Sequence, residues 1–460
     1  MRNQWTIFIS VFQGVEAKNI LRTDIFRILR EQQDLRIVLF VQDKAKREYF
    51  RKQFVGTNIY YEIPHPYKGS ILDSLFSFLK IALLRTRTMD LRRREAFESS
   101  DYSGYKSYLR YYGLSVLNVL FATAFFRKLT RWLDWRLVRS DNFEEVFDKY
   151  KPNLVFLANL FSDIEIAMLR EAKKRDIKTV GLINSWDKIT SRCMIRLLPD
   201  KLIVHNEIIK REAIKYAEMP EKDIEVTGIP HYDIFINSRA TQRSEFCRRF
   251  GLDPEKRFLV FCPLGKRYGD IDLEILDILL DFKNKKLLPE DVEIMVRFPP
   301  NDTVDLDSFK TRGVLFYQPG IRFAVGNERR VEWDMDEEDN QIFLDTLFHC
   351  SLLVCQASSL TIDASVFDKP IINFKIKSER NILPPRDGNW LYGLNHYQYI
   401  LYSGGVQLVT TKDEFLKWIN KYLTDPKIDA RGRKKIREEQ CWKLDGQAGR
   451  RVTNSILKML

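Results

Sequence analysis

The chain has 460 residues, of which 45% are hydrophobic and 30% are charged, and its formal net charge is +12. A chain of this length exceeds what one hydrophobic core ordinarily serves, so we expect two domains, and the composition excludes a disordered or collagen-like chain. The positive charge favours anionic partners such as nucleotides, phosphate esters or an acidic membrane surface. We expect no nucleic-acid partner, because the sequence carries no RRM, KH or zinc-finger motif.

The six cysteines and the first residues of the chain both bear on cellular location. The cysteines form no CxxC pair and no metal-like spacing, which is typical of reduced thiols in a cytoplasmic protein. The initial segment, MRNQWTIFISVF, lacks the long apolar core and the cleavage site of a signal peptide and instead has the pattern of a first core strand. We therefore expect a cytoplasmic protein without a metal site.

Short apolar runs alternate with helical patterns through much of the first half of the chain. Helical patterns follow the first run, at 17–31, and the third run, after Asn159. Near-continuous apolar strands that alternate with helices predict a parallel sheet covered on both faces. The expected strands are 6–12, 35–41, 151–157, 178–183, 201–205 and 224–230.

Residues 70–139 interrupt this alternation with two apolar helical stretches, each followed by a basic run. The second stretch, 113–126, is shorter than the roughly 18 residues that a membrane span needs. Trp132, Trp135 and the neighbouring cations fit a helix lying at a bilayer surface, with its rings and charges at the headgroups. Two interpretations stay open: contact with an anionic membrane, or a helical insertion that simply packs on the first domain.

The alternation of strands and helices restarts after residue 236. We place the domains at 1–236, 237–438 and a final helix at 439–460. The predicted fold class is α/β, with two Rossmann-like doubly wound domains and a helical, basic and aromatic insertion in the first; such sheets bind ligands at the carboxyl ends of their strands. The expected strands of the second domain are 257–264, 292–298, 313–319, 351–356 and 369–374.

The segment CQASSLTIDASVFDKPIINF, residues 355–374, is the most informative motif. A buried strand ends at Gln356, and Ser358 and Ser359 stand where the next helix begins. Free N–H groups and the helix dipole make such a position suitable for phosphate, and the carboxylate of Asp363, one turn further on, suits a ribose diol. The alternative is an ordinary serine N-cap.

This strand, Ser-Ser and helix segment resembles the donor-nucleotide site of GT-B glycosyltransferases and their relatives, including the glycerophosphotransferases that build teichoic acids. Residues 198–233, which end in TGIPHYD, resemble the segment that closes the first domain of those enzymes, and 410–426 with 438–457 resemble their C-terminal helices. The resemblance covers residues 1–69 and 140–460. It implies the GT-B fold, in which the last helix crosses back onto the first domain.

The resemblance also implies a donor site. It places the nucleotide diphosphate near Ser358 and Ser359, and Asp363 at the sugar or ribose. Where these relatives often carry a basic residue followed by His-Pro, this chain has an arginine followed by Phe298-Pro299, without the histidine that glycerophosphotransferases usually keep. The cations and the glycine implied at the phosphates are Gly265, Lys266, Arg267 and Arg297.

The stretch GLINSWDKITSRC supplies the first candidate for a catalytic base. Asp187 follows an expected strand of the first domain at its carboxyl end, where ligands bind in this fold; the alternative is that Asp187 caps the following helix. His396 follows a Gly/Pro-rich loop and is the second candidate. The weaker rivals are Glu16, Asp24 and His231.

Metal chemistry has only one candidate motif, DMD at 334–336. Because it lies in the acidic run EWDMDEED, we expect a solvated helix start there, and cationic side chains in place of a metal.

Together these features predict a nucleotide-sugar-dependent, metal-independent glycosyltransferase without a cofactor, peripheral at the inner face of the cell membrane. It would move a sugar from a nucleotide-sugar to a lipid-linked or polysaccharide acceptor in cell-envelope glycan synthesis. Three alternatives stay open on the same fold: a CDP-glycerol-type glycerophosphotransferase, a sugar-nucleotide epimerase, or a non-catalytic membrane-docked scaffold. The sequence leaves the base and sugar of the donor open, and also the acceptor, the stereochemistry and the oligomeric state.

Overall fold

The computed structural model describes residues 4–98, 105–265, 270–301, 306–323, 332–380, 382 and 387–460. The chain divides into two compact units. Unit 1 consists of Met1–Arg93, Ser103–Ile236 and Gln440–Leu460, and unit 2 consists of Arg94–Tyr102 and Asn237–Glu439. The end of the chain therefore belongs to unit 1, although all of unit 2 precedes it in the sequence.

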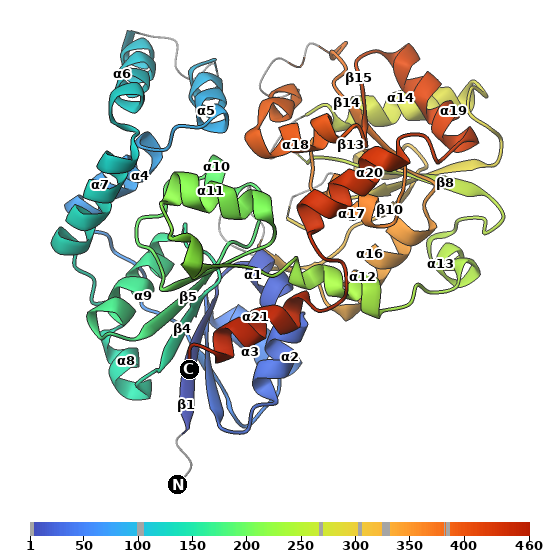
Figure 1. Cartoon of the computed structure of the whole chain (residues 1–460). Coiled ribbons are helices and arrows are strands. Elements are labelled where there is room, and N and C mark those ends of the chain that lie inside the picture. The colour runs from blue at the N-terminus through green and yellow to red at the C-terminus, as the bar shows by residue number, and fades with distance from the viewer. Residues whose placement is uncertain are drawn as a thin grey trace. The chain divides into compact units, whose positions relative to one another are not determined.

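Unit 1 is built on a seven-stranded parallel sheet in the order β3-β2-β1-β4-β5-β6-β7 (Figure 1). Because the chain adds strands outward from β1 and then from β4, the switch point of the sheet lies between these two strands. Residues of β1 alternate between the faces: Phe8 joins one core cluster, and Ile7 and Ile9 join the other. The strands are β1 (Trp5–Val11), β2 (Leu35–Val41), β3 (Ile59–Glu62), β4 (Leu154–Leu157), β5 (Lys178–Leu182), β6 (Lys201–Val204) and β7 (Ile224–Val226).

Helices cover both faces of this sheet. They are α1 (Gly14–Ile20), α2 (Asp24–Arg30), α3 (Lys44–Gln53), α8 (Glu144–Tyr150), α9 (Asp163–Lys174), α10 (Lys188–Ser191), α11 (Glu207–Ala217) and α21 (Ala448–Leu457). Phe147 of α8 and Ile209 of α11 join the cluster on one face. Ile25 of α2 and Val452 of α21 join the cluster on the other, so the C-terminal helix completes the core of unit 1 (Figure 1).

Two features of the sheet and of the helices that cover it differ from expectation. The helix expected at 17–31 is two helices, because the hydroxyl of Thr23 accepts a hydrogen bond from the Ile25 N–H (3.3 Å) and starts α2 afresh. The edge strand β3 was not expected, since among its four residues only Ile59 is buried and the sequence shows no apolar run there.

Unit 2 has a six-stranded parallel sheet in the order β10-β9-β8-β13-β14-β15 and a two-stranded antiparallel pair, β11-β12. Its strands are β8 (Arg257–Cys262), β9 (Val292–Arg297), β10 (Leu315–Tyr317), β11 (Ile321–Phe323), β12 (Glu332–Asp334), β13 (Leu352–Cys355), β14 (Ile371–Phe374) and β15 (Gln407–Val409). Its main helices are α13 (Arg243–Phe250), α14 (Asp272–Asn284), α16 (Glu337–His349), α17 (Leu360–Val366), α18 (Asn395–Ser403), α19 (Lys412–Thr424) and α20 (Ala430–Ile436).

The DMD motif of unit 2 is only in part the solvated helix start that we expected. Asp334 ends β12 and is fully buried. Asp336 is the N-cap of α16, where its carboxylate accepts the Asp339 N–H at 2.9 Å. The motif thus joins a short strand to a helix, and N-capping accounts for the carboxylate of Asp336.

The insertion at 70–139 contains four helices in place of the two expected stretches: α4 (Ile71–Ala82), α5 (Arg87–Glu98), α6 (Tyr105–Phe121) and α7 (Ala124–Leu137). The apolar run at 113–126 spans the break between α6 and α7, because Thr123 caps α7 through the Phe126 N–H. Among the described residues, no single helix combines the length and hydrophobicity needed to cross a bilayer. α6 and α7 have that length and hydrophobicity only when they are taken together, and the pair is bent by 99° at its junction.

Helix α7 packs its charged face against the rest of unit 1, and its apolar face points away from the rest of unit 1. Arg127 and Arg131 are buried and both pair with Glu218, just beyond α11, at distances of 2.5 and 2.8 Å. The side chains of Phe125 and Trp132, on the opposite face, are 68% and 55% exposed. A helix on a soluble core has the reverse arrangement, so the sequence pattern alone gives the wrong face.

Helix α4 has the same inverted arrangement. Asp73 and Lys80 are buried and pair with Arg196 (2.8 Å) and Asp163 (2.5 Å). Its outward residues are apolar, and Ile71 is 90% exposed. Asp134 of α7 completes the charged layer through Arg170 (2.6 Å) and Arg196 (2.7 Å). The exposed apolar residues of α4 and α7 are Ile71, Leu72, Leu75, Phe78, Ile81, Phe125, Leu129, Trp132 and Leu137.

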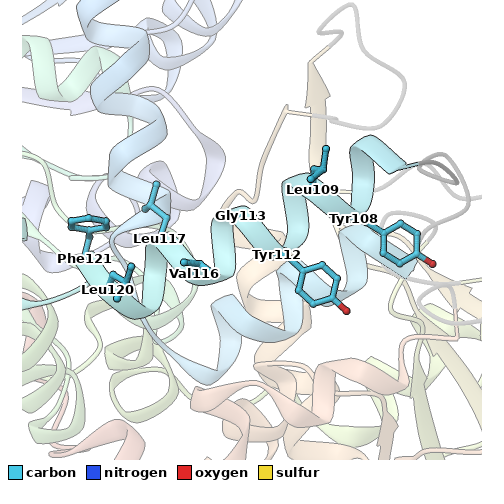
Figure 2. A pocket seen from close by; sticks show the side chains of 8 residues that line it. All are labelled: Tyr108, Leu109, Tyr112, Gly113, Val116, Leu117, Leu120 and Phe121. Atoms are coloured by element: carbon cyan, nitrogen blue, oxygen red, sulfur yellow. The ribbon is translucent and has the colours of Figure 1, made fainter.

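Helix α6 is exposed along most of its described length and carries an apolar depression of about 480 Å³. Figure 2 shows Tyr108, Leu109, Tyr112 and Val116 around Gly113, where the absence of a side chain leaves the surface hollow. A Cβ at Gly113 would meet nothing within 4 Å. The buried Asn118 anchors the helix, because its amide donates to main-chain carbonyls at the end of α4 (2.6 and 3.0 Å).

Candidate functional site

The loop after β8 is held in a defined conformation at the carboxyl edge of the unit 2 sheet. The N–H groups of Leu264 and Gly265 donate to the two carboxylate oxygens of Asp272, at 2.9 and 2.8 Å. Gly265 has φ +92°, which favours glycine. Lys266 and Arg267, the cations predicted for the same loop, lie outside the described residues.

Arg297 ends β9, beside β8, and is only 5% exposed. Its guanidinium lies 4.2 Å from the ring centroid of Phe343 in α16, which is a cation–π contact. Burial lowers the pKa of Arg297, while Cys262 and the carboxylate of Asp363 act in the opposite direction. The structure thus brings two of the predicted residues, Arg297 and Asp363, within electrostatic reach of each other.

Helix α17 begins directly after the predicted serine pair. The Ser358 hydroxyl accepts the Leu360 N–H at 3.3 Å, whereas Ser359, the N-cap residue, makes no capping hydrogen bond with its side chain. Ser359 is exposed, Ser358 is half-buried and Asp363 is buried. Capping therefore accounts for Ser358 and leaves the Ser359 hydroxyl at the surface.

Buried polar side chains that the sequence analysis missed support the same edge. Gln356 is fully buried, and its amide donates to the Asp387 carbonyl at 2.9 Å while its Oε1 makes no hydrogen bond. A Cβ at Gly388 would lie 2.4 Å from that Oε1, so only glycine fits there. Tyr397 of α18 joins the Thr361 hydroxyl (2.9 Å) and the Asn373 amide oxygen (2.7 Å). His396, the neighbour of Tyr397, is half-buried in the first turn of α18.

Asp187 follows the β5 strand of unit 1 and precedes α10. Its carboxylate accepts hydrogen bonds from the hydroxyls of Ser185 and, at 2.9 Å, Ser191, and makes no N-capping hydrogen bond. Asp187 therefore occupies the N-cap position of α10, but its side chain binds hydroxyls and not the N–H groups of the helix start. The carboxylate is half-buried, held by two hydroxyls at the carboxyl edge of the sheet.

A buried charge cluster lies under the same edge. Glu16 accepts the N–H groups of Phe12 and Gln13 (2.6 and 3.0 Å), and Glu165 accepts the Asn159 N–H (2.7 Å). Both glutamates are fully buried, and in each the Oε1 makes no hydrogen bond. The Lys188 ammonium donates to the Asn159 amide oxygen at 3.0 Å.

The electrostatics of this cluster follow from burial. Burial raises the pKa of Glu16, against the attraction of Lys188, and raises the pKa of Glu165 further, where the charge of Glu16 adds to it. Burial lowers the pKa of Lys188, and Glu16 opposes that shift. Two buried carboxyls with raised pKa values and one ammonium with a lowered pKa thus lie at the ends of β1, β4 and β5. Of the two acids, only Glu16 was weighed from the sequence; Glu165 gave no recognisable signal.

The ends of β6 and β7 carry two histidines and the neighbouring Glu212. Burial lowers the pKa of His205 to about 4 and that of His231 well below its usual range. The His231 Nδ1 lies 2.7 Å from the Asn19 amide oxygen, so the first helix holds this ring. Glu212 of α11 is buried, and burial, together with the charge of Asp187, raises its pKa to about 8. Asp24, the remaining rival, pairs with Arg27 on α2.

Each unit thus presents polar side chains at the carboxyl edge of a parallel sheet. The unit 2 edge has a buried cation, a surface hydroxyl and a helix start, which suit a phosphate-containing ligand. The unit 1 edge has a half-buried carboxylate beside a protonated one, which suits proton transfer. Among the described residues, no group of three or more His, Cys, Asp or Glu side chains is arranged to hold a metal ion.

Residues 176–458 match the family described as CDP-Glycerol:Poly(glycerophosphate) glycerophosphotransferase. Over 246 residues, 52% of this chain, the sequence is 23% identical to the UDP-N,N'-diacetylbacillosamine 2-epimerase (hydrolyzing) of Legionella pneumophila. The match spans 60% of the length of that protein.

This chain matches solved structures of the same fold over nearly its whole length. The UDP-GlcNAc 2-epimerase from Neisseria meningitidis bound to UDP-GlcNAc is 12% identical, with a TM-score of 0.55 over 98% of this chain and 100% of that chain. The wall teichoic acid polymerase TagF is 12% identical, with a TM-score of 0.52 over 100% of this chain and 89% of that chain. These likenesses confirm the predicted fold class of two parallel-sheet α/β domains.

Proposed function

Since the chain belongs to the CDP-glycerol:poly(glycerophosphate) glycerophosphotransferase family, we propose that it is a transferase that uses a nucleotide-diphosphate-linked donor and a lipid-linked or polysaccharide acceptor of the cell envelope. The observation that carries this proposal is the unit 2 edge, where Arg297 and Asp363 are buried within electrostatic reach of each other and Ser359 is exposed at the start of α17. We assign the donor to unit 2 and the acceptor to unit 1.

Within this class we propose transfer of a sugar. Phe298 stands where glycerophosphotransferases usually carry a histidine; it is fully buried, and its ring packs on Phe309 and Phe316 at centroid distances of 4.6 and 5.8 Å. A phenyl ring takes up no proton and carries no charge, so this position gives no help to a phosphate group. The family match itself supports the second candidate, transfer of glycerol phosphate from CDP-glycerol.

The two candidates differ in the bond that breaks. In sugar transfer the acceptor oxygen attacks the anomeric carbon, the bond from that carbon to the phosphate oxygen breaks, and a nucleoside diphosphate leaves. In glycerol phosphate transfer the acceptor oxygen attacks the distal phosphorus, the pyrophosphate bond breaks, and a nucleoside monophosphate leaves. In both, the developing negative charge on the leaving group needs cations and N–H donors, and the acceptor hydroxyl must lose its proton to a base.

Asp187 is the residue that we assign to the base. Its carboxylate is held by Ser185 and Ser191 and stays partly open to solvent. The charge of Asp187 contributes to the raised pKa of the neighbouring Glu212, which burial and this charge bring to about 8. We propose no base role for His396. Its half-buried place in α18 of unit 2 supports a part in lining the donor site.

A thermal-shift screen against UDP-, GDP-, CDP- and dTDP-linked donors tests the donor assignment. We expect one nucleotide series to raise the unfolding temperature. With Ser358→Ala/Ser359→Ala, about ten times more donor should be needed for the same rise in unfolding temperature. Unchanged binding by the double variant would refute the donor site. Absence of protection by every nucleotide would favour a non-catalytic scaffold.

Two further measurements address the chemistry. Chromatography of the nucleotide product separates sugar transfer, which releases a diphosphate, from glycerol phosphate transfer, which releases a monophosphate. Asp187→Asn should reduce turnover by at least about a hundredfold and spare donor binding. If the variant instead loses stability and keeps activity, Asp187 is a structural residue. The proposed location, cytoplasmic and peripheral at the inner face of the membrane, fits a lipid-linked acceptor.

A further inference from the structure

The charged layer beneath α4 and α7 fixes these helices in one orientation. On α7, Phe125, Leu129 and Trp132 point away from the rest of unit 1. Arg127, Arg131 and Asp134, each two positions later in the sequence, point toward it. The inward set is held by ion pairs that are almost fully buried. If the helix rotated to bury its apolar side chains, these charged groups would lose their ion-pair partners, which costs several kcal/mol per ion.

The outward face is apolar, aromatic and free of exposed acids. Asp73 and Asp134 are the only acidic residues in the sequences of α4, α6 and α7, and both are buried. Exposed cations lie among the apolar residues: Lys128 and Arg136 on α7, the latter with its guanidinium 5.6 Å from the Trp132 ring centroid. An apolar face edged by cations and tryptophan complements a bilayer with anionic headgroups.

We propose that the outward residues of α4, α6 and α7, termed here the insertion face, dock on a bilayer that contains anionic lipid. The apolar side chains reach the acyl boundary, and Lys128 and Arg136 lie at the headgroups. The depression over Gly113 on α6 (Figure 2) adds an apolar surface open to solvent. The inference specifies the surface behind the proposed membrane location, and it does not depend on the chemistry that the protein performs.

Vesicle co-sedimentation of the full chain tests this surface. We expect binding to vesicles that contain phosphatidylglycerol, weaker binding to phosphatidylcholine vesicles, and a decrease with salt. Phe125→Ser and Trp132→Ser should each lower the partition coefficient about tenfold or more. Lys128→Gln should lower it about fivefold, and only on the anionic vesicles. Val55→Ser, which alters a 79% exposed apolar residue in the loop between α3 and β3, should leave it unchanged.

Several outcomes would overturn the proposal. Absence of wild-type binding to anionic vesicles at low salt would do so, as would binding by a Phe125→Ser/Trp132→Ser variant equal to that of the wild type. Self-association of the wild type without vesicle binding, abolished by the same pair, would identify the face as an interface between copies of this chain. Because the altered side chains are exposed, unfolding temperature and donor protection should not change, and this separates the result from a failure of the proposed function.

A different observation links the insertion to the Asp187 loop. The Thr86 hydroxyl donates to the Thr190 carbonyl at 2.7 Å, and the Met194 N–H donates to the Lys80 carbonyl at 2.8 Å. The Arg92 guanidinium donates to a third carbonyl, that of Ser191. Three hydrogen bonds from the α4–α5 region thus hold the main chain that follows Asp187.

From these contacts we infer that membrane docking orders the Asp187 loop. Hydrogen exchange measured by mass spectrometry, with and without phosphatidylglycerol vesicles, tests this. In the wild type the peptide spanning 184–195 should exchange more slowly when vesicles are present, together with the peptides of α4 and α7. In Thr86→Val/Arg92→Met, vesicle binding should persist and the loop protection should be lost. Protection confined to α4 and α7 in the wild type would overturn this inference and leave the docking surface intact.

Discussion

Asp134→Ala tests whether the charged layer beneath α7 stabilises unit 1. The Asp134 carboxylate is 1% exposed and serves two guanidiniums, those of Arg170 (2.6 Å) and Arg196 (2.7 Å), which are 2% and 1% exposed. Removing one partner of a buried ion pair costs about 3–5 kcal/mol. Arg196 keeps its pair with Asp73 at 2.8 Å, and Arg170 keeps the main-chain carbonyl of residue 134 at 2.9 Å. We therefore expect a loss near the lower limit, about 3 kcal/mol.

Equilibrium urea unfolding measures this loss, with hydrogen exchange of β1 and β4 peptides reporting on unit 1 alone. The two units need not unfold together, so a single global transition would not isolate the effect. Asp141→Ala is the matched control, since Asp141 is exposed in the same unit and should change the free energy of unfolding by less than about 0.5 kcal/mol. A loss below about 1 kcal/mol in Asp134→Ala would show that the layer contributes no more than a surface pair, and would refute the reasoning.

Three further predictions concern stability. A Cβ at Gly432 would lie 2.2 Å from the Gly404 carbonyl carbon and 2.3 Å from the Gly405 nitrogen, so Gly432→Ala should lower the free energy of unfolding of unit 2 by about 3 kcal/mol or more; an unchanged unfolding temperature would contradict this close contact. Glu212 has its pKa raised to about 8, so the folded state holds a proton that the unfolded state releases above its own pKa. Stability of the wild type relative to Glu212→Gln should therefore fall as pH rises from about 4.5 to about 8, by on the order of 4 kcal/mol in urea unfolding, and a flat difference would count against it. Gly113→Ala fills an open position in α6 and should stabilise that helix by about 0.5–1 kcal/mol, seen as slower hydrogen exchange of the α6 peptide; faster exchange would show that the glycine is required.

The strands of both sheets were largely predictable because burial on two faces leaves a strong mark on the sequence. β1 and β2 are near-continuous apolar runs, and the structure buries almost every residue in them. The edge strands β3 and β15 were not predicted, since each has one buried residue and their polar positions match a loop equally well. The other two edge strands, β7 and β10, were predicted within 224–230 and 313–319, although they are no more buried than β3 and β15.

The insertion shows a different limit of sequence analysis. The spacing of Phe125, Leu129 and Trp132 gives an amphipathic helix, but the spacing is the same whether that face lies inward or outward. The choice depends on Arg127 and Arg131 reaching Glu218, a residue about 90 positions away in the sequence. No local pattern contains that information.

The candidate site was predictable to the extent that it follows strand ends. Asp187 was proposed because it comes directly after an apolar run, and the structure places it at the carboxyl end of β5. Glu165 was not proposed, because a charged residue in a helical first turn is ordinarily solvated. Only the fold brings Glu165 and Lys188 under the sheet edge, with Glu16, around Asn159.

The position of α21 has a consequence for how the chain is made. Its first residues, Ala448 and Gly449, donate their N–H groups to Asp233 at 3.0 and 2.7 Å, and its Val452 and Ile456 complete the core beneath β1. These residues leave the ribosome after all of unit 2. During synthesis, unit 2 can therefore close its own core while unit 1 still has an open apolar groove where α21 will pack. The part of the protein translated first is thus the part that finishes folding last.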